Sequence, residues 1–151
     1  MTIAGQTYTV TQRGIRDDVI IDFGSDRGIW CFMNMGTWLQ IIPLSAESVT
    51  TGDIDGDGQD DIIMDFGSGI GLWTWFSNSG AWLQIIPLSP EFVTTGDIDG
   101  SGQDDIIMDF GPGIGLYTWF SNSGAWLRII PLSPESVATG DTDGEGQDDS
   151  V

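Results

Sequence analysis

The sequence predicts an all-β protein made of tandem repeats, and three observations support this. Residues 50–93 and 94–137 differ at only five of their 44 positions. Each repeat contains short β-branched or aromatic runs separated by Gly, Pro, Asn and Ser, which is typical of strands joined by turns. No stretch shows the helical period of about 3.6 residues. A repeat of this length is typical of solenoids, propellers and similar arrays, whose periods are roughly 20–50 residues.

The repeats make residues 1–151 a single array. It comprises a diverged first copy without a metal loop, two near-identical repeats and the start of a further repeat: 1–49, 50–93, 94–137 and 138–151. The first copy is identified by DDVIIDFGS at 17–25, which matches DDIIMDFGS at 60–68. About three sets of outer strands result, fewer than the roughly four to eight blades of a closed ring.

Each repeat offers four short strand candidates, which around the second repeat are residues 62–66, 71–76, 81–86 and 91–96. Apolar side chains occupy both faces of these strands, as Ile62 and Met64 alternate with Ile63. A sheet covered on both sides requires this pattern, and radially stacked blades cover sheets in this way. The predicted fold is therefore a β-propeller-like array of four-stranded antiparallel blades, about three in this chain.

Composition narrows the classes of function. The chain has 23 acidic residues, four basic residues, no His and a net charge of −19. This charge repels nucleic acid and anionic membrane surfaces and favours cations. No apolar run approaches the roughly 20 residues of a membrane-spanning helix, so membrane insertion is not expected. A single cysteine, Cys31, permits no intrachain disulfide, and we expect it to be a packed, unreactive residue.

An Asp-rich loop recurs three times and predicts metal binding. Oxygen-bearing residues occupy its alternate positions one, three, five, seven and nine, and the seventh contributes its main-chain carbonyl. A hard cation such as Ca²⁺ prefers six to eight oxygen ligands, which such a tightly turning loop can supply. The predicted ligands are Asp53, Asp55, Asp57, Gln59 and Asp61; Asp97, Asp99, Ser101, Gln103 and Asp105; and Asp141, Asp143, Glu145, Gln147 and Asp149.

Two other kinds of loop have similar sequences. An EF-hand requires a bidentate Glu at its twelfth position and a following helix, but Met64 or Met108 stands there and a strand candidate follows. An Asx turn without metal is the simpler alternative, because such turns are common between strands. However, four carboxylates within nine residues repel one another unless a cation is present.

The segment GDIDGDGQDDIIMDFG at 52–67 resembles the calcium-binding FG-GAP/VCBS blade repeat of integrin-like β-propellers, and the resemblance extends from Asp17 to Asp149. It implies four-stranded blades, calcium in the loop between the first two strands, and use outside the cytoplasm, at the cell surface or beyond. It also implies a role in adhesion, in carbohydrate binding or as a non-catalytic part of a larger protein. The first copy departs from the pattern, because residues 10–18 retain only Asp18.

The sequence therefore favours a calcium-stabilised extracellular structural or adhesive module. The alternative is a lectin-like module that binds glycans, with aromatic residues such as Trp73 and Trp82 as stacking platforms, although their spacing favours packing between blades. An enzyme is not expected, because the chain lacks His and Lys and offers only carboxylate chemistry.

The ends of the array suggest self-association. The first copy has strands but no metal loop, whereas 138–151 has a metal loop without its following strands. Because an open strand edge recruits partners, we expect the tail to dock on the first blade of another copy, as a ring or a filament. Two alternatives remain open: the chain is a fragment of a longer array, or residues 5–12 complete the first blade within one chain. A surface protein or a glycan is a further possible partner.

Overall fold

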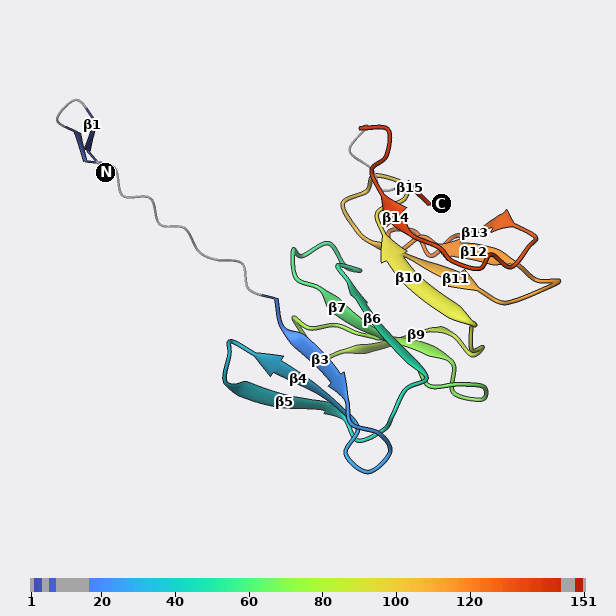
Figure 1. The fold of residues 1–151 in the computed structure, drawn as a ribbon, viewed down its shortest axis with the longest axis horizontal. Coiled ribbons are helices and arrows are strands. Elements are labelled where there is room, and N and C mark those ends of the chain that lie inside the picture. The colour runs from blue at the N-terminus through green and yellow to red at the C-terminus, as the bar shows by residue number, and fades with distance from the viewer. Residues whose placement is uncertain (1, 4–5, 8–16, 145–148, 151) are drawn as a thin grey trace. The chain divides into compact units, whose positions relative to one another are not determined.

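The computed structural model is all-β and describes residues 2–3, 6–7, 17–144 and 149–150. The chain divides into two compact units, Met1–Leu44 and Ser45–Val151. The described residues form antiparallel sheets of three, four and four strands, together with two short two-stranded pairs (Figure 1). These sheets do not close into a barrel. The predicted class, a tandem array of blade-like antiparallel sheets, is confirmed.

Unit 1 contains one three-stranded sheet. Its strands follow the order of the chain: β3 (Val19–Asp22), β4 (Ile29–Met33) and β5 (Thr37–Ile42). Two short strands precede them, β1 (Thr2–Ile3) and β2 (Gln6–Thr7), and pair with each other. The alternative inner strand at residues 5–12 lies largely outside the described residues. Within the described residues, no strand pairs with the free side of β3.

Unit 2 contains two four-stranded meanders, which we call sheet C and sheet D. Sheet C comprises β6 (Ser48–Gly52), β7 (Asp61–Asp65), β8 (Leu72–Trp75) and β9 (Trp82–Ile86). Sheet D comprises β10 (Phe92–Gly96), β11 (Asp105–Asp109), β12 (Leu116–Trp119) and β13 (Trp126–Ile130). A final pair, β14 (Thr139–Gly140) with β15 (Asp149–Ser150), repeats the register with which each meander begins.

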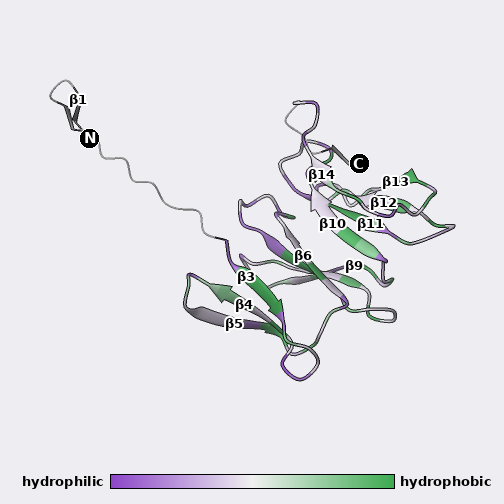
Figure 2. Ribbon diagram, in the orientation of Figure 1, coloured by the Kyte–Doolittle hydropathy of each residue, from purple (hydrophilic) through white to green (hydrophobic). Residues whose placement is uncertain are grey.

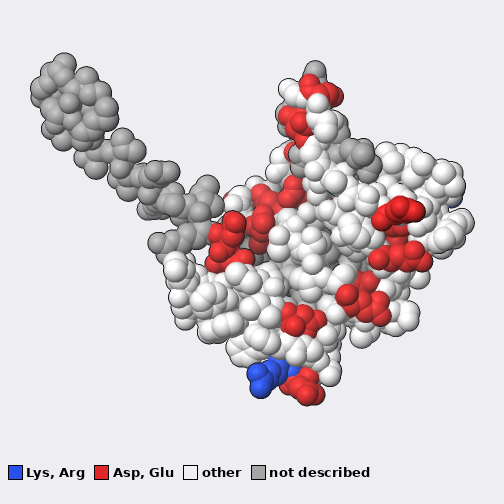
Figure 3. Space-filling view, in the orientation of Figure 1, with Lys and Arg blue, Asp and Glu red and all other residues white. Residues whose placement is uncertain are grey.

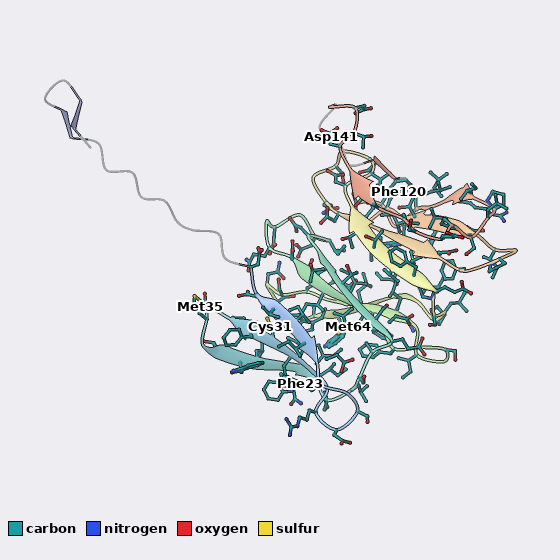
Figure 4. The ribbon with its side chains drawn as sticks, in the orientation of Figure 1. Phe23, Cys31, Met35, Met64, Phe120 and Asp141 are labelled. Atoms are coloured by element: carbon teal, nitrogen blue, oxygen red, sulfur yellow. The ribbon has the colours of Figure 1, made fainter. Side chains whose placement is uncertain are left out.

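The hydrophobic core of unit 2 lies between sheets C and D. It contains Ile54 with Ile63 and Leu72 of sheet C, packed with Val93, Ile106 and Met108 of sheet D. All five residues of β7 and of β11 are buried, as expected of strands with apolar side chains on both faces. Hydrophobic residues lie on β3, β4 and part of β10 in Figure 2. Met64 and Cys31, labelled in Figure 4, are buried on β7 and β4.

The Asp residue before each Phe-Gly turn anchors that turn. Asp22, Asp65 and Asp109 each accept a hydrogen bond from the glycine amide two residues later, at 2.8, 2.9 and 2.9 Å. In unit 2 the second carboxylate oxygen accepts a hydroxyl hydrogen bond, from Ser89 to Asp65 and from Ser133 to Asp109. These buried carboxylates therefore have structural partners at both oxygens.

Successive repeats of unit 2 are connected along their first strands. The Thr95 hydroxyl donates to the Thr51 carbonyl at 2.6 Å, and the Thr139 hydroxyl donates to the Thr95 carbonyl at 2.7 Å. Gly52 allows this approach, because a Cβ at that position would lie 2.9 Å from both the Cβ and the Oγ1 of Thr95. The described residues include no helix with the length and apolar character that a membrane crossing requires.

Candidate metal centre

The Asp-rich loops join the first two strands of each meander. Loop one (residues 53–60) follows β6, and loop two (residues 97–104) follows β10. Register pairs Gly52 with Asp61 and Gly96 with Asp105, so the ends of each loop meet across a strand pair. The first and ninth positions of the motif therefore lie close together.

Loop one winds around the carboxylate of its first residue. Asp53 Oδ1 accepts the amide hydrogens of Gly56 at 2.8 Å and Asp57 at 3.0 Å, and Oδ2 accepts that of Gly58 at 2.8 Å. Gly56 and Gly58 have φ angles of 76° and 87°, in the left-handed region that favours glycine. The two glycines of the motif thus allow the loop to close around Asp53.

This winding brings carboxylates together in both repeats. One oxygen from each of Asp53, Asp55 and Asp61 lies within 4.8 Å of the other two. Asp97, Asp99 and Asp105 form a matching group in loop two. Each group, which we call an acidic triad, could hold a metal ion. The donors are all carboxylate oxygens, which are ligands that hard cations such as Mg²⁺ and Ca²⁺ prefer.

The ninth residue of the motif is a fully buried carboxylate in the first two copies, Asp61 and Asp105. Asp61 accepts hydrogen bonds from the amides of Ile54 at 3.1 Å and Ser77 at 3.0 Å. Asp105 accepts the equivalent amides, Ile98 at 3.0 Å and Ser121 at 3.0 Å. Through these hydrogen bonds, the buried carboxylate connects the Asp-rich loop to the turn between the third and fourth strands of the same meander.

Burial makes the charged form of these two residues unfavourable. Desolvation raises the pKa of Asp61, and the nearby Asp55 charge raises it further, while the amides of Ser77 and Ile54 lower it. Desolvation also raises the pKa of Asp105, to about 6, with a smaller contribution from Asp99. A cation in the triad would favour the ionised carboxylates and reverse this effect.

The remaining predicted ligands of loops one and two lie around the triads. Asp57 Oδ1 accepts the Gln59 amide at 2.8 Å, and Gln59 is exposed. The Ser101 hydroxyl oxygen lies 3.3 Å from the main-chain nitrogen of Gln103 and 3.4 Å from its main-chain carbonyl oxygen. The side chain at the fifth position is therefore close to the main chain at the seventh. Neither Asp57 nor Ser101 belongs to a triad.

Loop three is described only in part. Asp141 lies at its start (Figure 4) and accepts the Gly144 amide at 2.8 Å, as Asp53 accepts that of Gly56. Asp143 is exposed. Glu145 and Gln147 lie outside the described residues, and Asp149 is described only through its pairing with Gly140.

Several residues around the triads were not singled out from the sequence. Asn78 Nδ2 donates to Asp55 Oδ2 and to Asp57 Oδ2, both at 2.7 Å. Asp104 and the side chain of Gln103 contact loop one from loop two. Their recurrence in the sequence could have identified these residues as candidates. Ser-Asn follows the third strand, and two consecutive Asp residues end the motif, in both full repeats.

Acidic side chains form several patches on the face shown in Figure 3, which has little basic surface. Unit 1 differs from the two full repeats. Its Asp18, the remnant of the motif, accepts the Asn34 amide at 3.4 Å, and no acidic triad occurs among the described residues of this unit. Unit 1 instead has an open cleft of about 420 Å³, lined by Phe23, Asp26, Arg27, Trp30, Trp38 and Gln40.

No family model matches the sequence, and no match was found among curated proteins. The resemblance to FG-GAP/VCBS repeats therefore stays a prediction based on the loop motif and the repeat length.

Proposed function

We propose that the protein is a calcium-stabilised structural or adhesive β-repeat module that acts outside the cell or at its surface. The pair of acidic triads carries this proposal. Each triad combines a fully buried carboxylate with two carboxylates of the preceding loop, and the two triads use the equivalent positions one, three and nine of the motif. Recurrence at equivalent positions favours a common ligand over a chance cluster of acidic residues.

The position of the triads supports a stabilising role. A cation bound by Asp53, Asp55 and Asp61 would join the loop to the first residue of β7, a strand that is buried throughout. It would also offset the desolvation of Asp61. Loops of extracellular modules commonly bind calcium weakly, with dissociation constants on the order of 10⁻⁴–10⁻³ M, which suits the calcium supply outside cells.

The same proposal includes association between copies or with further repeats. Strand β3 is an edge strand among the described residues, and its Val19 is 51% exposed. On β13, Ile129 and Ile130 are each 38% exposed, whereas their counterparts in sheet C, Ile85 and Ile86, pack against the core. Open edges and uncovered apolar faces of this kind favour further β-sheet partners.

A calcium titration tests the proposal. We expect calcium to bind, to raise the melting temperature and to increase particle size in light scattering. Asp53→Asn combined with Asp97→Asn is the matched control, because it removes one charge from each triad. Binding of calcium that is unchanged in this double variant would contradict the assignment. Particles that remain monomeric in calcium would contradict self-association alone.

Carbohydrate binding is the second candidate, and the cleft of unit 1 favours it. Phe23 and Trp38 have ring centroids 6.1 Å apart, and both rings are substantially exposed. Asp26, Arg27 and Gln40 add polar groups to the rim of these aromatic surfaces. Aromatic faces with nearby polar groups suit a sugar, whose C–H face stacks while its hydroxyls form hydrogen bonds.

The cleft has a structural basis in main-chain contacts. Trp30 Nε1 and Gln40 Nε2 both donate to the Arg27 carbonyl, at 2.8 and 3.0 Å. Sheet C repeats these contacts, because Trp73 and Gln84 donate to the Ile70 carbonyl. Asp26 and Arg27 of unit 1 are replaced there by Gly69 and Ile70. The charged part of the rim, Asp26 and Arg27, is therefore specific to the first copy, whereas Gln40 corresponds to Gln84.

Glycan-array binding tests this candidate. We expect Trp38→Ala to abolish a glycan signal, whereas the matched Trp82→Ala in sheet C should preserve it. A signal lost equally in both variants would place the binding elsewhere. No signal on the array would contradict carbohydrate binding and leave the calcium proposal unaffected.

A further inference from the structure

We infer that loop two positions loop one, so that the two acidic triads are coupled through Gln103 and Asp104. This inference rests on the proposed calcium binding. It assigns to these residues a role toward the preceding repeat, in addition to the place of Gln103 in its own loop.

Asp104 forms two hydrogen bonds with the main chain of Asp53. Its amide donates to the Asp53 carbonyl at 2.7 Å, and its Oδ2 accepts the Asp53 amide at 2.8 Å. Asp53 is the residue around which loop one winds. The contact therefore fixes the main chain of the first triad member at both of its polar groups.

Gln103 contacts the second triad member of loop one. Its Nε2 donates to the Asp55 carbonyl at 2.8 Å across a partly buried contact. The fit is close, because a Cβ at Gly56 would lie 2.8 Å from Gln103 Cγ. The Gln103 side chain thus packs against the turn that brings Asp53 and Asp55 together.

The two contacting residues directly precede a member of the second triad. Asp105 is the buried carboxylate of that triad, and the main-chain carbonyl of Gln103 is a predicted ligand of the same site. Ordering of residues 103–105 by a cation in loop two would therefore order the surface on which loop one rests. Thermodynamic linkage requires the reverse effect to be of equal size.

Calcium titration by calorimetry tests the coupling, with all variants carrying Asp141→Asn so that loop three does not contribute. Asp97→Asn silences the second site and isolates the first, and Asp53→Asn does the reverse. We expect each site to bind more weakly when the other is silenced, by the same factor. Equal affinities with and without the other site would overturn the coupling.

The contact itself is tested in the Asp97→Asn background. Asp104→Ala should weaken the first site by about tenfold, the usual scale for losing a hydrogen bond to a charged group. Gln103→Ala should weaken calcium binding at the first site less than Asp104→Ala does. This change removes only the side chain of Gln103, so the main-chain carbonyl that is a predicted ligand of the second site is retained. Glu135→Ala is the control, because it removes an exposed carboxylate outside the Asp-rich loops and should have no effect on this site. Equal loss in Glu135→Ala and Asp104→Ala would overturn the positioning role.

Hydrogen exchange of the Asp53 amide gives a readout that needs no metal. We expect this amide to be protected in chelator and to lose protection in Asp104→Ala but not in Glu135→Ala, which removes an exposed carboxylate outside the Asp-rich loops. Protection unchanged by Asp104→Ala would overturn the inference. If neither loop binds calcium while the exchange result holds, the proposed function fails and the contact between the loops stands.

Discussion

Loop one and loop two have the same sequence through the ninth position of the motif, except that Ser101 replaces Asp57. Their described surroundings differ as well. Asn78 donates hydrogen bonds to Asp55 and Asp57 of loop one, and Gln103 and Asp104 of loop two contact the main chain of loop one. The residues of the third repeat that correspond to Gln103 and Asp104 in sequence lie outside the described residues. The environment of loop one therefore depends on the repeat that follows it as well as on its own motif.

The two buried carboxylates, in contrast, resemble each other. Asp61 and Asp105 are equally buried and accept equivalent amides. Each is disfavoured as an anion by desolvation, and the pKa of Asp105 rises to about 6. Four predictions follow from this comparison, in order of decreasing effect.

Removal of calcium from both loops should have the largest effect. A site occupied at about 100 times its dissociation constant contributes roughly 2.7 kcal/mol to the free energy of unfolding, so two sites contribute about 5 kcal/mol. Differential scanning calorimetry with excess chelator should show a markedly lower melting temperature. An unchanged melting curve, with metal analysis showing that the ion has been removed, would contradict calcium binding at both loops.

Without metal, stability should fall as pH rises from about 4 to about 6. The folded pKa of Asp105 is raised from 3.8 to about 6, so the unfolded chain releases this proton first. Below pH 3.8, Asp105 is protonated in both states and does not change the free energy of unfolding. Above about pH 6 it is ionised in both states, and its burial lowers the free energy of unfolding by roughly 3 kcal/mol. Urea unfolding in chelator at pH 4.5 and 7 measures this difference in stability. Asp105→Asn should flatten the profile, and a profile that keeps its slope would assign the dependence to other carboxylates.

Gly52→Ala should destabilise the protein by disrupting the packing of β6, the strand before loop one, against the next repeat. The added Cβ would lie 2.9 Å from Thr95 Cβ and 3.0 Å from Asp104 Oδ2, and such overpacking costs about 1–3 kcal/mol. Gly140→Ala is the matched control, because a Cβ there meets no described atom within 4 Å. Chemical denaturation should show a loss for Gly52→Ala alone. Equal losses would indicate a general strand effect.

The smallest effect on calcium affinity is expected from changes at the fifth position of the motif, where Asp57 in loop one corresponds to Ser101 in loop two. Ser101→Asp adds a charged oxygen ligand and should tighten the second site by about tenfold, whereas Asp57→Ser should weaken the first by a similar factor. Calcium titration of the single-site backgrounds measures both. Affinities that do not respond to either exchange would place the fifth position outside the ligand set.

The sequence predicted the strands well because local patterns determine them. The apolar run at residues 62–66 corresponds to β7, and its occupation of both faces corresponds to burial of every residue in that strand. The glycines of the turns, and Pro87 directly after β9, predicted where the following strands begin and end. The spacing of Asp53, Asp55 and Asp61 likewise predicted a group that the structure brings together.

Contacts between repeats could not be predicted in this way. The bond from the Asp53 amide to Asp104 joins residues 51 positions apart and depends on how neighbouring meanders pack. Position 74 gives a second example. Thr74 and Thr118 are buried with no hydrogen-bond partner for Oγ1 among the described residues, and Cys31 occupies the matching place in unit 1. The sequence predicted a packed Cys31 but gave no sign of buried, unpaired hydroxyls at the matching positions.

The threonine contacts between first strands have a consequence for the length of the array. Thr95 bonds to Thr51 and Thr139 bonds to Thr95, and each pair is separated by 44 positions. Insertion or removal of one whole 44-residue period would leave each such threonine beside the carbonyl 44 residues earlier. A change of this kind would therefore alter the number of repeats and keep the hydrogen bond at every joint between them.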